Sequence, residues 1–132
     1  MRVLLETDNA IVGFDEMKKS IMVIWSSDPE DKEFSSVYHC VLKAFKIYFV
    51  DKLINDFAHL SKLTPYQSDF LTDSIFPLAY KCGMRKLINV GSNLGIVEGF
   101  TENVGSNFSK NGHKLIIQTS NNFDEALARI KA

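Results

Sequence analysis

The chain has few cysteines and no excess of charge of either sign. Its 132 residues include two cysteines, Cys40 and Cys82, which are too few for a disulfide framework and form no Cys-x-x-Cys or Cys/His pattern. We expect both to be reduced and buried, because free cysteine behaves as a small hydrophobic residue. Fifteen Lys and Arg against sixteen Asp and Glu leave a formal charge of −1. The composition therefore gives no basic excess for binding nucleic acid or an anionic membrane.

Long hydrophobic runs are also absent. The longest stretch without a charged side chain, Leu87–Val97, is far shorter than the roughly 18 to 20 apolar residues that cross a bilayer. The first residues carry one arginine and then acidic residues, unlike a secretory signal. We therefore expect no membrane span and a cytoplasmic location.

Motifs of catalysis and metal binding are missing as well. The three histidines lie in different parts of the chain with no Cys, Asp or Glu at ligand spacing: His39, His59 and His113. No Gly-x-Ser-x-Gly elbow is present. The loop Gly91–Gly95 follows a strand pattern but lacks the fingerprint of a P-loop or a dinucleotide site. The sequence predicts no metal, no cofactor and no enzyme activity, and we expect Gly95 and Gly99 to serve close packing of a helix.

Strand patterns are frequent in what remains. Hydrophobic residues make up 45% of the chain, enough for the core of one domain over residues 1–132. Short apolar runs predict six strands: Val3–Glu6, Ala10–Phe14, Ser20–Trp25, Leu53–Ala58, Lys86–Val90 and His113–Gln118. A short charged link between the second and third runs is typical of an antiparallel hairpin. The unbroken hydrophobicity of the last run predicts a strand covered on both faces.

Two helices are expected in the first two thirds of the chain. Asp28-Pro29 predicts a helix start with Asp28 as the cap. The apolar stripe of this helix is Phe34, Val37, Tyr38, Val41, Leu42, Phe45, Tyr48 and Phe49. The segment Thr64-Pro65-Tyr66-Gln67 fits a capping box that begins a second helix. Its inward residues are expected to be Tyr66, Phe70, Leu71, Ile75, Leu78 and Ala79, with a kink at Pro77 and an end at Gly83.

Two more helices follow, and together the elements define the fold class. One is expected after Gly91-Ser92-Asn93 and ends at Asn111-Gly112, and the last is capped by Asn122. Alternating strands and helices imply right-handed crossovers. We predict an α/β fold with a mixed, mainly parallel sheet, an N-terminal antiparallel hairpin and about four helices.

Several segments resemble a known family. These are Glu6-Thr7-Asp8, Ile24-Trp25, Leu53-Ile54-Asn55-Asp56-Phe57, Ile75-Phe76-Pro77-Leu78-Ala79 and Gly83-Met84-Arg85-Lys86. In this order they resemble small single-domain STAS-like proteins, relatives of the bacterial anti-sigma-factor antagonists. The resemblance implies a regulatory domain that binds a protein partner. It also implies a phosphorylatable hydroxyl at the start of the helix after the strand that ends near Asp56. The Asp-Ser-Ser-Gly type of turn is replaced here by Leu63-Thr64-Pro65-Tyr66, so Thr64 is the candidate phospho-acceptor and Ser61 a second one.

Polar residues follow three of the predicted parallel strands. Because ligands of open α/β sheets bind outside the carboxyl ends of the strands, these residues predict a rim for a small anion. The rim residues are Asp56, His59, Ser61, Ser92, Asn93, Ser120 and Asn121. The same residue types are also what helix caps and turns require, so a purely structural role is the alternative.

Three hypotheses for function result. The first is a non-enzymatic regulatory domain of the STAS-like type that binds a protein partner. The alternative is a carrier of a small molecule or lipid, bound at the rim or in an apolar pocket beneath the first helix near Tyr38, Phe45, Tyr48 and Phe49. The third is an enzyme centred on Asp56 and His59. An exposed hairpin edge would also allow a homodimer.

Overall fold

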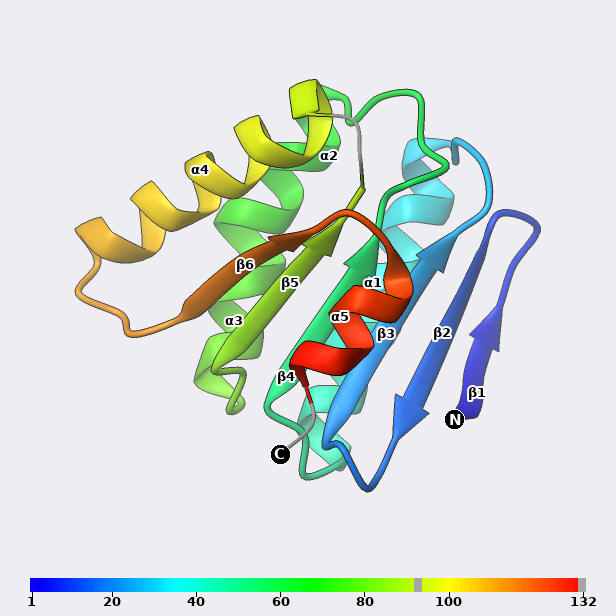
Figure 1. Cartoon of the computed structure of the whole chain (residues 1–132), viewed down its shortest axis with the longest axis horizontal. Coiled ribbons are helices and arrows are strands. Elements are labelled where there is room, and N and C mark those ends of the chain that lie inside the picture. The colour runs from blue at the N-terminus through cyan, green and yellow to red at the C-terminus, as the bar shows by residue number, and fades with distance from the viewer. Residues whose placement is uncertain (92–93, 131–132) are drawn as a thin grey trace.

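The fold is a six-stranded sheet with helices on both faces (Figure 1). The computed structural model describes residues 1–91 and 94–130, with the side chains of all of these except 94–96. The strands are β1 (Arg2–Glu6), β2 (Ala10–Asp15), β3 (Ser20–Trp25), β4 (Lys52–Asp56), β5 (Lys86–Val90) and β6 (Ile116–Ser120). They lie side by side in the order in which they occur along the chain.

The sheet is mixed, as predicted. Strands β1, β2 and β3 pair antiparallel, and β3, β4, β5 and β6 pair parallel. In the parallel part, Leu53 of β4 lies opposite Leu87 of β5, and Ile117 of β6 follows in the same row. The prediction of an N-terminal hairpin leading into a parallel sheet is confirmed.

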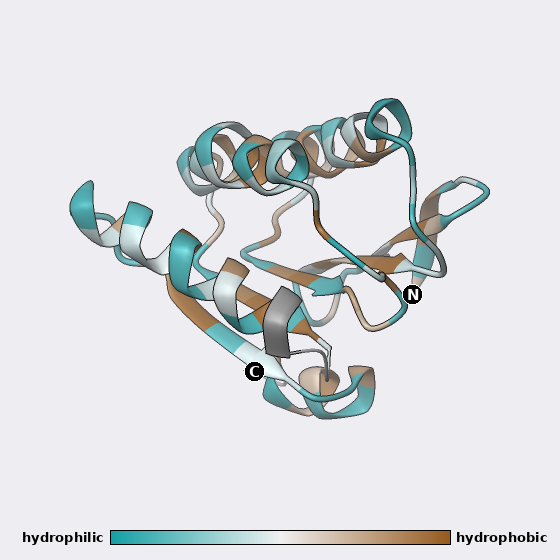
Figure 2. Ribbon diagram, turned by 90° about the horizontal axis from the view of Figure 1, so that it is seen from above, coloured by the Kyte–Doolittle hydropathy of each residue, from teal (hydrophilic) through white to brown (hydrophobic). Residues whose placement is uncertain are grey.

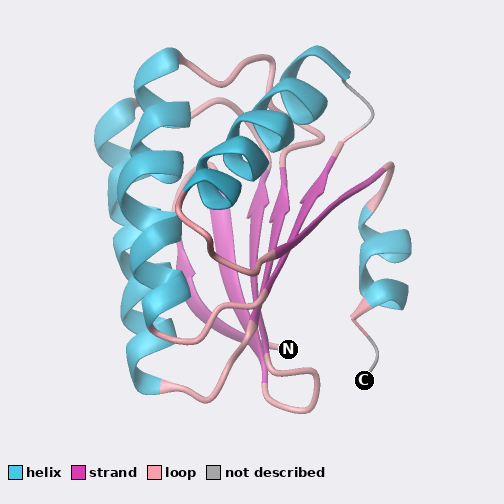
Figure 3. Ribbon diagram, turned by 90° about the vertical axis from the view of Figure 1, so that its left-hand side faces the viewer, coloured by secondary structure: helices cyan, strands magenta, loops and turns pink. Residues whose placement is uncertain are grey.

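The helical elements form four units. They are α1 (Asp31–Ile47), the continuous rod α2 (Pro65–Phe70), η1 (Leu71–Ile75) and α3 (Phe76–Lys81), then α4 (Leu94–Lys110) and α5 (Phe123–Arg129). Each crossover between parallel strands steps in the same direction across the sheet, so right-handed connections place α1, the rod and α4 on one face. Figure 3 shows α5 by itself on the opposite face.

Burial follows these two faces. The main core lies between the sheet and the three larger helical units and includes Trp25, Phe34, Tyr38, Phe57 and Phe76. A smaller cluster under α5 joins Met22, Ile54, Ile88 and Val90 of the sheet to Ala126 and Ile130. Figure 2 shows the strongly hydrophobic strands between the two layers. Among the described helices, none is both long enough and apolar enough to cross a membrane.

Local signals in the sequence act as predicted at four places. The Thr64 hydroxyl accepts the backbone N–H of Gln67 while the Gln67 side chain accepts that of Thr64, which completes the capping box. Asn122 caps α5 by accepting the N–H of Glu125 at 2.8 Å. Gly83 after α3 and Gly112 after α4 have φ of +119° and +70°, which glycine adopts without strain.

Two helix predictions were wrong in detail. Asp28 does not cap α1, whose N-cap residue is Glu30 and makes no side-chain cap bond. In the rod, Phe76 N–H donates to the Leu71 carbonyl, five residues back, so η1 is a π-turn. Pro77 has no N–H to continue the ordinary pattern. The extra residue in this turn rotates the stripe beyond it, and Leu78 is 42% exposed rather than inward. Tyr66, before the turn, is 52% exposed because Gln67 and Leu71 occupy the inward face there.

Two predictions of burial were also wrong. Helix α1 ends at Ile47 and Tyr48 is extended, so Phe49 leaves the apolar stripe and is 98% exposed. Strand β6 begins at Ile116 and forms the outer edge of the sheet, where Ile116 is 57% exposed. Continuous hydrophobicity does not distinguish an edge strand from a central one, because the position in the sheet depends on the whole topology.

Candidate functional site

The predicted rim lies at the carboxyl edge of the sheet, where β3, β4, β5 and β6 end and the chain turns toward α1, α2, α4 and α5. Of the rim residues, Ser92 and Asn93 lie outside the described residues. The others are engaged in different ways, and they do not converge on one ligand position.

Asp56 and His59 do not form a catalytic pair. Asp56 is buried and its Oδ1 accepts the backbone N–H of Ala58 at 3.0 Å, which shapes the turn after β4. His59 is exposed, and within the described structure no hydrogen bond joins it to Asp56. The geometry gives no support to an enzyme centred on these two residues.

Ser61 is held by Asp28 from the loop before α1. The Ser61 hydroxyl donates to Asp28 Oδ2, and the Ser61 backbone N–H donates to Asp28 Oδ1 at 2.8 Å. These two hydrogen bonds, aided by the charge of Lys62, lower the pKa of the Asp28 carboxyl. Asp28 thus joins two loops of the rim instead of capping a helix, a long-range role that local sequence cannot reveal.

Thr64 is likewise occupied, since its hydroxyl oxygen accepts the N–H of Gln67 at 3.1 Å. Gln67 is buried and also donates from Nε2 to Asp31 Oδ1 at 3.2 Å, which ties the start of α2 to α1. Thr64 itself is only half-buried. Both predicted phospho-acceptors therefore have structural roles in the described structure.

Ser120 and Asn121 end the rim on the β6 side. Ser120 is 3% exposed, and its hydroxyl has no hydrogen-bond partner among the described residues. Asn121 is exposed. A buried hydroxyl without a partner is uncommon in proteins, but a single serine does not define a ligand.

A groove of about 330 Å³ runs between the loop after β4 and the outer side of α4. Its lining is Ser61, Lys62, Leu63, Ser68, Gly99, Phe100 and Asn103. A Cβ at Gly99 would meet nothing within 4 Å, so the expectation that Gly99 serves close packing was wrong; Gly95 lies among the side-chain positions that are not described. The absence of a side chain at Gly99 instead helps to keep this groove open.

A second hollow, of about 270 Å³, lies on the other side of the same loop and is acidic. It is lined by Asp28, Pro29, Glu30, Asp31, Lys62, Thr64 and Gln67. Nearby, Glu33 fixes the β1–β2 turn: its carboxylate accepts the Thr7 hydroxyl at 2.6 Å and the Asn9 side-chain amide at 2.6 Å. Burial acts to raise the pKa of Glu33, but these hydrogen bonds outweigh it and the pKa is lowered.

An exposed row of aromatic rings crosses from α2 to α1 beside the acidic hollow. The ring of Tyr66 stacks on Phe70 with centroids 6.2 Å apart, and Phe70 stacks on His39 at 5.7 Å. Tyr66 is 52% exposed and His39 is exposed. Sequence reasoning missed this row because it assigned Tyr66 and Phe70 to the core.

The aromatic residues proposed to line a pocket under the first helix do not share one. Tyr38 and Phe45 are buried in the core, and burial raises the pKa of the Tyr38 phenol. Tyr48 is half-buried and Phe49 projects into solvent.

A polar ladder, which sequence reasoning also missed, runs through the main core. Its members are Trp25, Tyr38, Asn55, Asn89 and Thr101. Tyr38 donates to Asn55 Oδ1 at 2.7 Å, Asn55 Nδ2 donates to Asn89 Oδ1 at 3.2 Å, and Asn89 Nδ2 donates to the Thr101 hydroxyl at 3.0 Å. One sequence signal could have revealed it: Lys-Leu-Ile-Asn occurs at 52–55 and again at 86–89, and the two asparagines are register partners.

The described residues also lack a metal site. No group of three or more His, Cys, Asp or Glu side chains in the described part of the chain could hold a metal ion. Cys40 and Cys82 are free and only half-buried, not fully buried as expected. Burial raises the pKa of the Cys40 thiol, partly opposed by the charge of Lys43, so the nucleophilic thiolate is disfavoured.

Comparison with known proteins adds no family to this description. No protein-family model matches the chain, and no curated protein matches it significantly. The geometry of the site therefore carries the functional argument.

Proposed function

We propose that the protein is a non-enzymatic interaction domain of the STAS-like type that binds a protein partner through the α1–α2 surface. We define this surface as Tyr66, Phe70 and His39 together with the acidic hollow beside them. The observation that carries the proposal is the exposed aromatic row, because accessible aromatic side chains supply much of the binding energy at protein interfaces.

The chemistry of the partner follows from the charges around the row. Asp28, Glu30 and Asp31 line the hollow, and Lys62 is its single cation. A partner that presents lysine or arginine beside an apolar side chain would match both parts of the surface. Hydrogen bonds support this surface structurally, since Ser61–Asp28 and Gln67–Asp31 hold the two helices and their loops together.

Phosphorylation would regulate this surface most simply at Thr64. A phosphate there would add negative charge at the start of α2, next to an already acidic hollow, and would disfavour a basic partner. At Ser61 a phosphate would face the Asp28 carboxylate and break the contact between the two loops. Thr64 is therefore the preferred phospho-acceptor in this proposal.

The test is quantitative affinity capture from an extract of the native cell with three baits: the wild-type protein, Tyr66→Ala and Phe49→Ala. Phe49 is the matched control, because it is an aromatic residue that is 98% exposed and belongs to a different surface. We expect one partner that Tyr66→Ala loses about tenfold or more, as for an interface hot spot, and that Phe49→Ala retains. A partner retained equally by Tyr66→Ala, or no specific partner, would refute the proposal.

The groove beside Gly99 favours a second candidate, a carrier of a small ligand. Its volume of about 330 Å³ falls within the range of small-molecule sites, and Lys62 and Asn103 could bind a polar head while Leu63 and Phe100 contact an apolar part. Native mass spectrometry of the freshly purified protein tests it. A co-purified ligand that Gly99→Leu removes would support the carrier, and ligand-free spectra would exclude it in favour of the interaction domain.

We also propose that the protein is cytoplasmic. We further propose that two copies form a homodimer through the edge strand β1. This strand has one unpaired side, although an irregularity between Val3 and Leu5 interrupts its regular pairing. Sedimentation of the wild-type protein and of Val3→Pro distinguishes a dimer through β1 from a monomer, since proline cannot donate to a new ladder.

A further inference from the structure

The opposite edge of the sheet, where the parallel strands begin, gathers three loops into one surface. The Asp51 N–H in the α1–β4 loop donates to the Lys19 carbonyl of the β2–β3 turn at 3.0 Å, and the Arg85 N–H of the α3–β5 loop donates to the Asp51 carbonyl at 2.8 Å. Figure 1 shows the β2–β3 turn and the α1–β4 loop together at the lower end of the molecule. The N-terminal end of β1 joins them, because the Arg2 guanidinium donates to the Tyr48 hydroxyl.

This edge is basic although the whole chain is slightly acidic. The segments 1–2, 15–20, 46–52 and 81–86 hold eight of the fifteen Lys and Arg residues and three of the sixteen Asp and Glu residues, a formal charge of +5. The rest of the chain, with seven basic and thirteen acidic residues, carries −6. A net charge of −1 thus conceals a strongly basic set of segments at this edge, and the basic excess that the whole composition lacks is present here.

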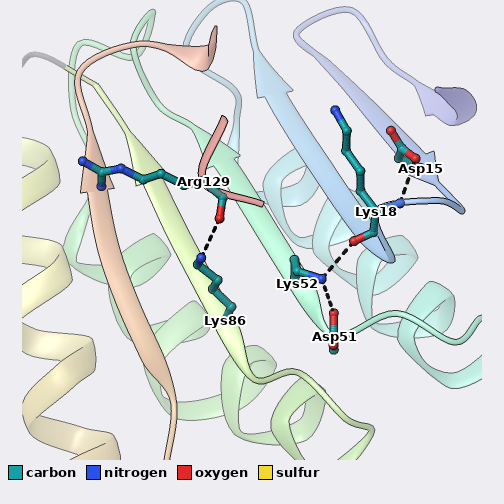
Figure 4. A network of polar contacts seen from close by, with 6 residues as sticks. All are labelled: Asp15, Lys18, Asp51, Lys52, Lys86 and Arg129. Atoms are coloured by element: carbon teal, nitrogen blue, oxygen red, sulfur yellow. Dashed lines mark hydrogen bonds and ion pairs between the residues drawn. The ribbon is translucent and has the colours of Figure 1, made fainter. Parts of the chain in front are cut away.

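Some of these basic side chains are hydrogen-bonded within the protein, and others are exposed and can bind a partner. Figure 4 shows Lys52 Nζ bound to Asp51 Oδ1 at 2.9 Å and to the Lys18 carbonyl, and Lys86 Nζ bound to the Arg129 carbonyl at 2.7 Å. Lys19, Lys46 and Lys81 are exposed, and within the described residues no ion pair engages them.

Apolar side chains project from the same loops and from the end of α1. Phe49 is 98% exposed, Met17 is 90% exposed and Ile47 is 60% exposed. Between them lies a rigid base in which Phe14 stacks on Tyr48 at 4.4 Å and the Arg2 guanidinium lies 5.4 and 5.2 Å from the two ring centroids. Grooves around this base are lined by Met17 on one side and by Ile47 and Phe49 on the other. Large apolar side chains this exposed, on loops held by backbone hydrogen bonds, indicate contact with another surface.

The backbone at Lys19 adds an independent observation. Its φ is +53°, the left-handed region that glycine or asparagine occupies at lower energy. A lysine at this position costs stability, which is consistent with a role for its charge at the tip of the turn.

We propose that this amino-edge patch, comprising Arg2, Met17, Lys19, Lys46, Ile47 and Phe49, docks on the surface of an anionic lipid bilayer. Phe49, Met17 and Ile47 would enter the interface between headgroups and acyl chains while Lys19 and Lys46 contact acidic headgroups. Stable attachment to a bilayer needs two such signals together. A nucleic acid would satisfy the lysines but not Met17 and Ile47. The carboxyl edge with its acidic hollow would point away from the membrane, which leaves the α1–α2 surface accessible.

Co-sedimentation of the purified full chain with vesicles tests the proposal. The vesicles are phosphatidylcholine alone or phosphatidylcholine mixed with phosphatidylserine. We expect binding to the mixed vesicles that weakens as salt is added, and little binding to phosphatidylcholine alone. Phe49→Ala should reduce binding about tenfold because its apolar area leaves the interface, and Lys46→Gln about fivefold because one cation is lost.

Matched variants at the other edge are the controls. Tyr66→Ala removes an exposed aromatic side chain, and Lys32→Gln removes an exposed cation from the opposite end of α1; both should bind vesicles as the wild type does. Absence of binding to mixed vesicles, or full binding by Phe49→Ala, would overturn the proposal. So would tighter binding to an oligonucleotide than to vesicles, or a dimer in sedimentation that Phe49→Ala dissociates. The outcome is separate from that of partner capture, because each assay uses the other surface as its control.

Discussion

Tyr38→Phe and Asn55→Leu remove adjacent members of the buried polar ladder, alone and together. Both residues are fully buried, so water cannot replace the lost hydrogen bonds. Tyr38→Phe leaves Asn55 Oδ1 without its donor and Trp25 Nε1, which donates to the Tyr38 hydroxyl at 3.4 Å, without its acceptor. Asn55→Leu leaves two groups without a partner, the Tyr38 hydroxyl donor and Asn89 Oδ1.

The magnitudes follow from the number of groups left unpaired. An unsatisfied buried polar group costs about 1–3 kcal/mol, and each single variant leaves two such groups, so we expect about 2–5 kcal/mol for Tyr38→Phe and for Asn55→Leu. In the double variant both the Tyr38 hydroxyl and Asn55 Oδ1 are absent, and the penalty that each carries in one single variant disappears. The double variant should therefore be more stable than the sum of the single variants predicts, by about 2–3 kcal/mol.

The assay is urea denaturation followed by the fluorescence of Trp25, the single tryptophan, which packs against Tyr38. Thr72→Val is the control partner for the cycle with Tyr38→Phe, because the Thr72 hydroxyl is buried without a hydrogen-bond partner among the described residues. That cycle should be additive. If the losses of unfolding free energy for Tyr38→Phe and Asn55→Leu also add to within about 0.5 kcal/mol, the ladder does not couple these two residues.

Three further predictions concern the turns and caps. Lys19→Gly should stabilise the protein by about 1 kcal/mol in thermal unfolding, because glycine adopts the positive φ at this position without strain. Unchanged or lower stability would show that Lys19 is not strained. Thr64→Ala should cost about 1 kcal/mol through loss of the N-cap, whereas Thr64→Ser should cost much less; equal losses would remove the hydroxyl from the explanation. Glu33 has a lowered folded-state pKa, so its stabilising effect is present above its ordinary pKa of 4.5 and is lost as the pH falls through the folded value. The Asn9 backbone N–H donates to Glu33 Oε2 at 3.1 Å. Hydrogen exchange at this backbone amide should therefore show lost protection only below about pH 4.5, in excess of the intrinsic pH effect, and in Glu33→Gln this pH dependence should be absent.

Much of the architecture could be predicted from patterns confined to a few residues. Apolar runs of strand length separated by helical patterns predicted the element order, and this order together with right-handed crossovers predicted the parallel sheet. The capping box at Thr64, the glycine ends at Gly83 and Gly112 and the Asn122 cap were predicted correctly. In each of these local signals the interacting groups lie within about one helical turn of each other.

The candidate sites could not be predicted in the same way. Asp28 has the composition of a helix cap, but its partner is Ser61, 33 positions along the chain. Tyr66 fits the core stripe of its helix, yet its neighbour Gln67 takes the inward position against α1 and leaves Tyr66 at the surface. The two Lys-Leu-Ile-Asn segments are visible in the sequence, but only the sheet register makes their asparagines neighbours.

The distribution of charge shows most clearly what the sequence determines and what only the folded structure determines. Composition establishes a net charge of −1 and the number of acidic and basic residues. Chain folding places most of the basic loops at one edge of the sheet, because the turn before β3 and the loops before β4 and β5 must all return to the edge where the parallel strands begin. Short-range preferences decide which residues form helices and strands, whereas electrostatic fields and exposed surfaces depend on distances between segments that are remote in sequence. Those distances exist only after the chain has folded.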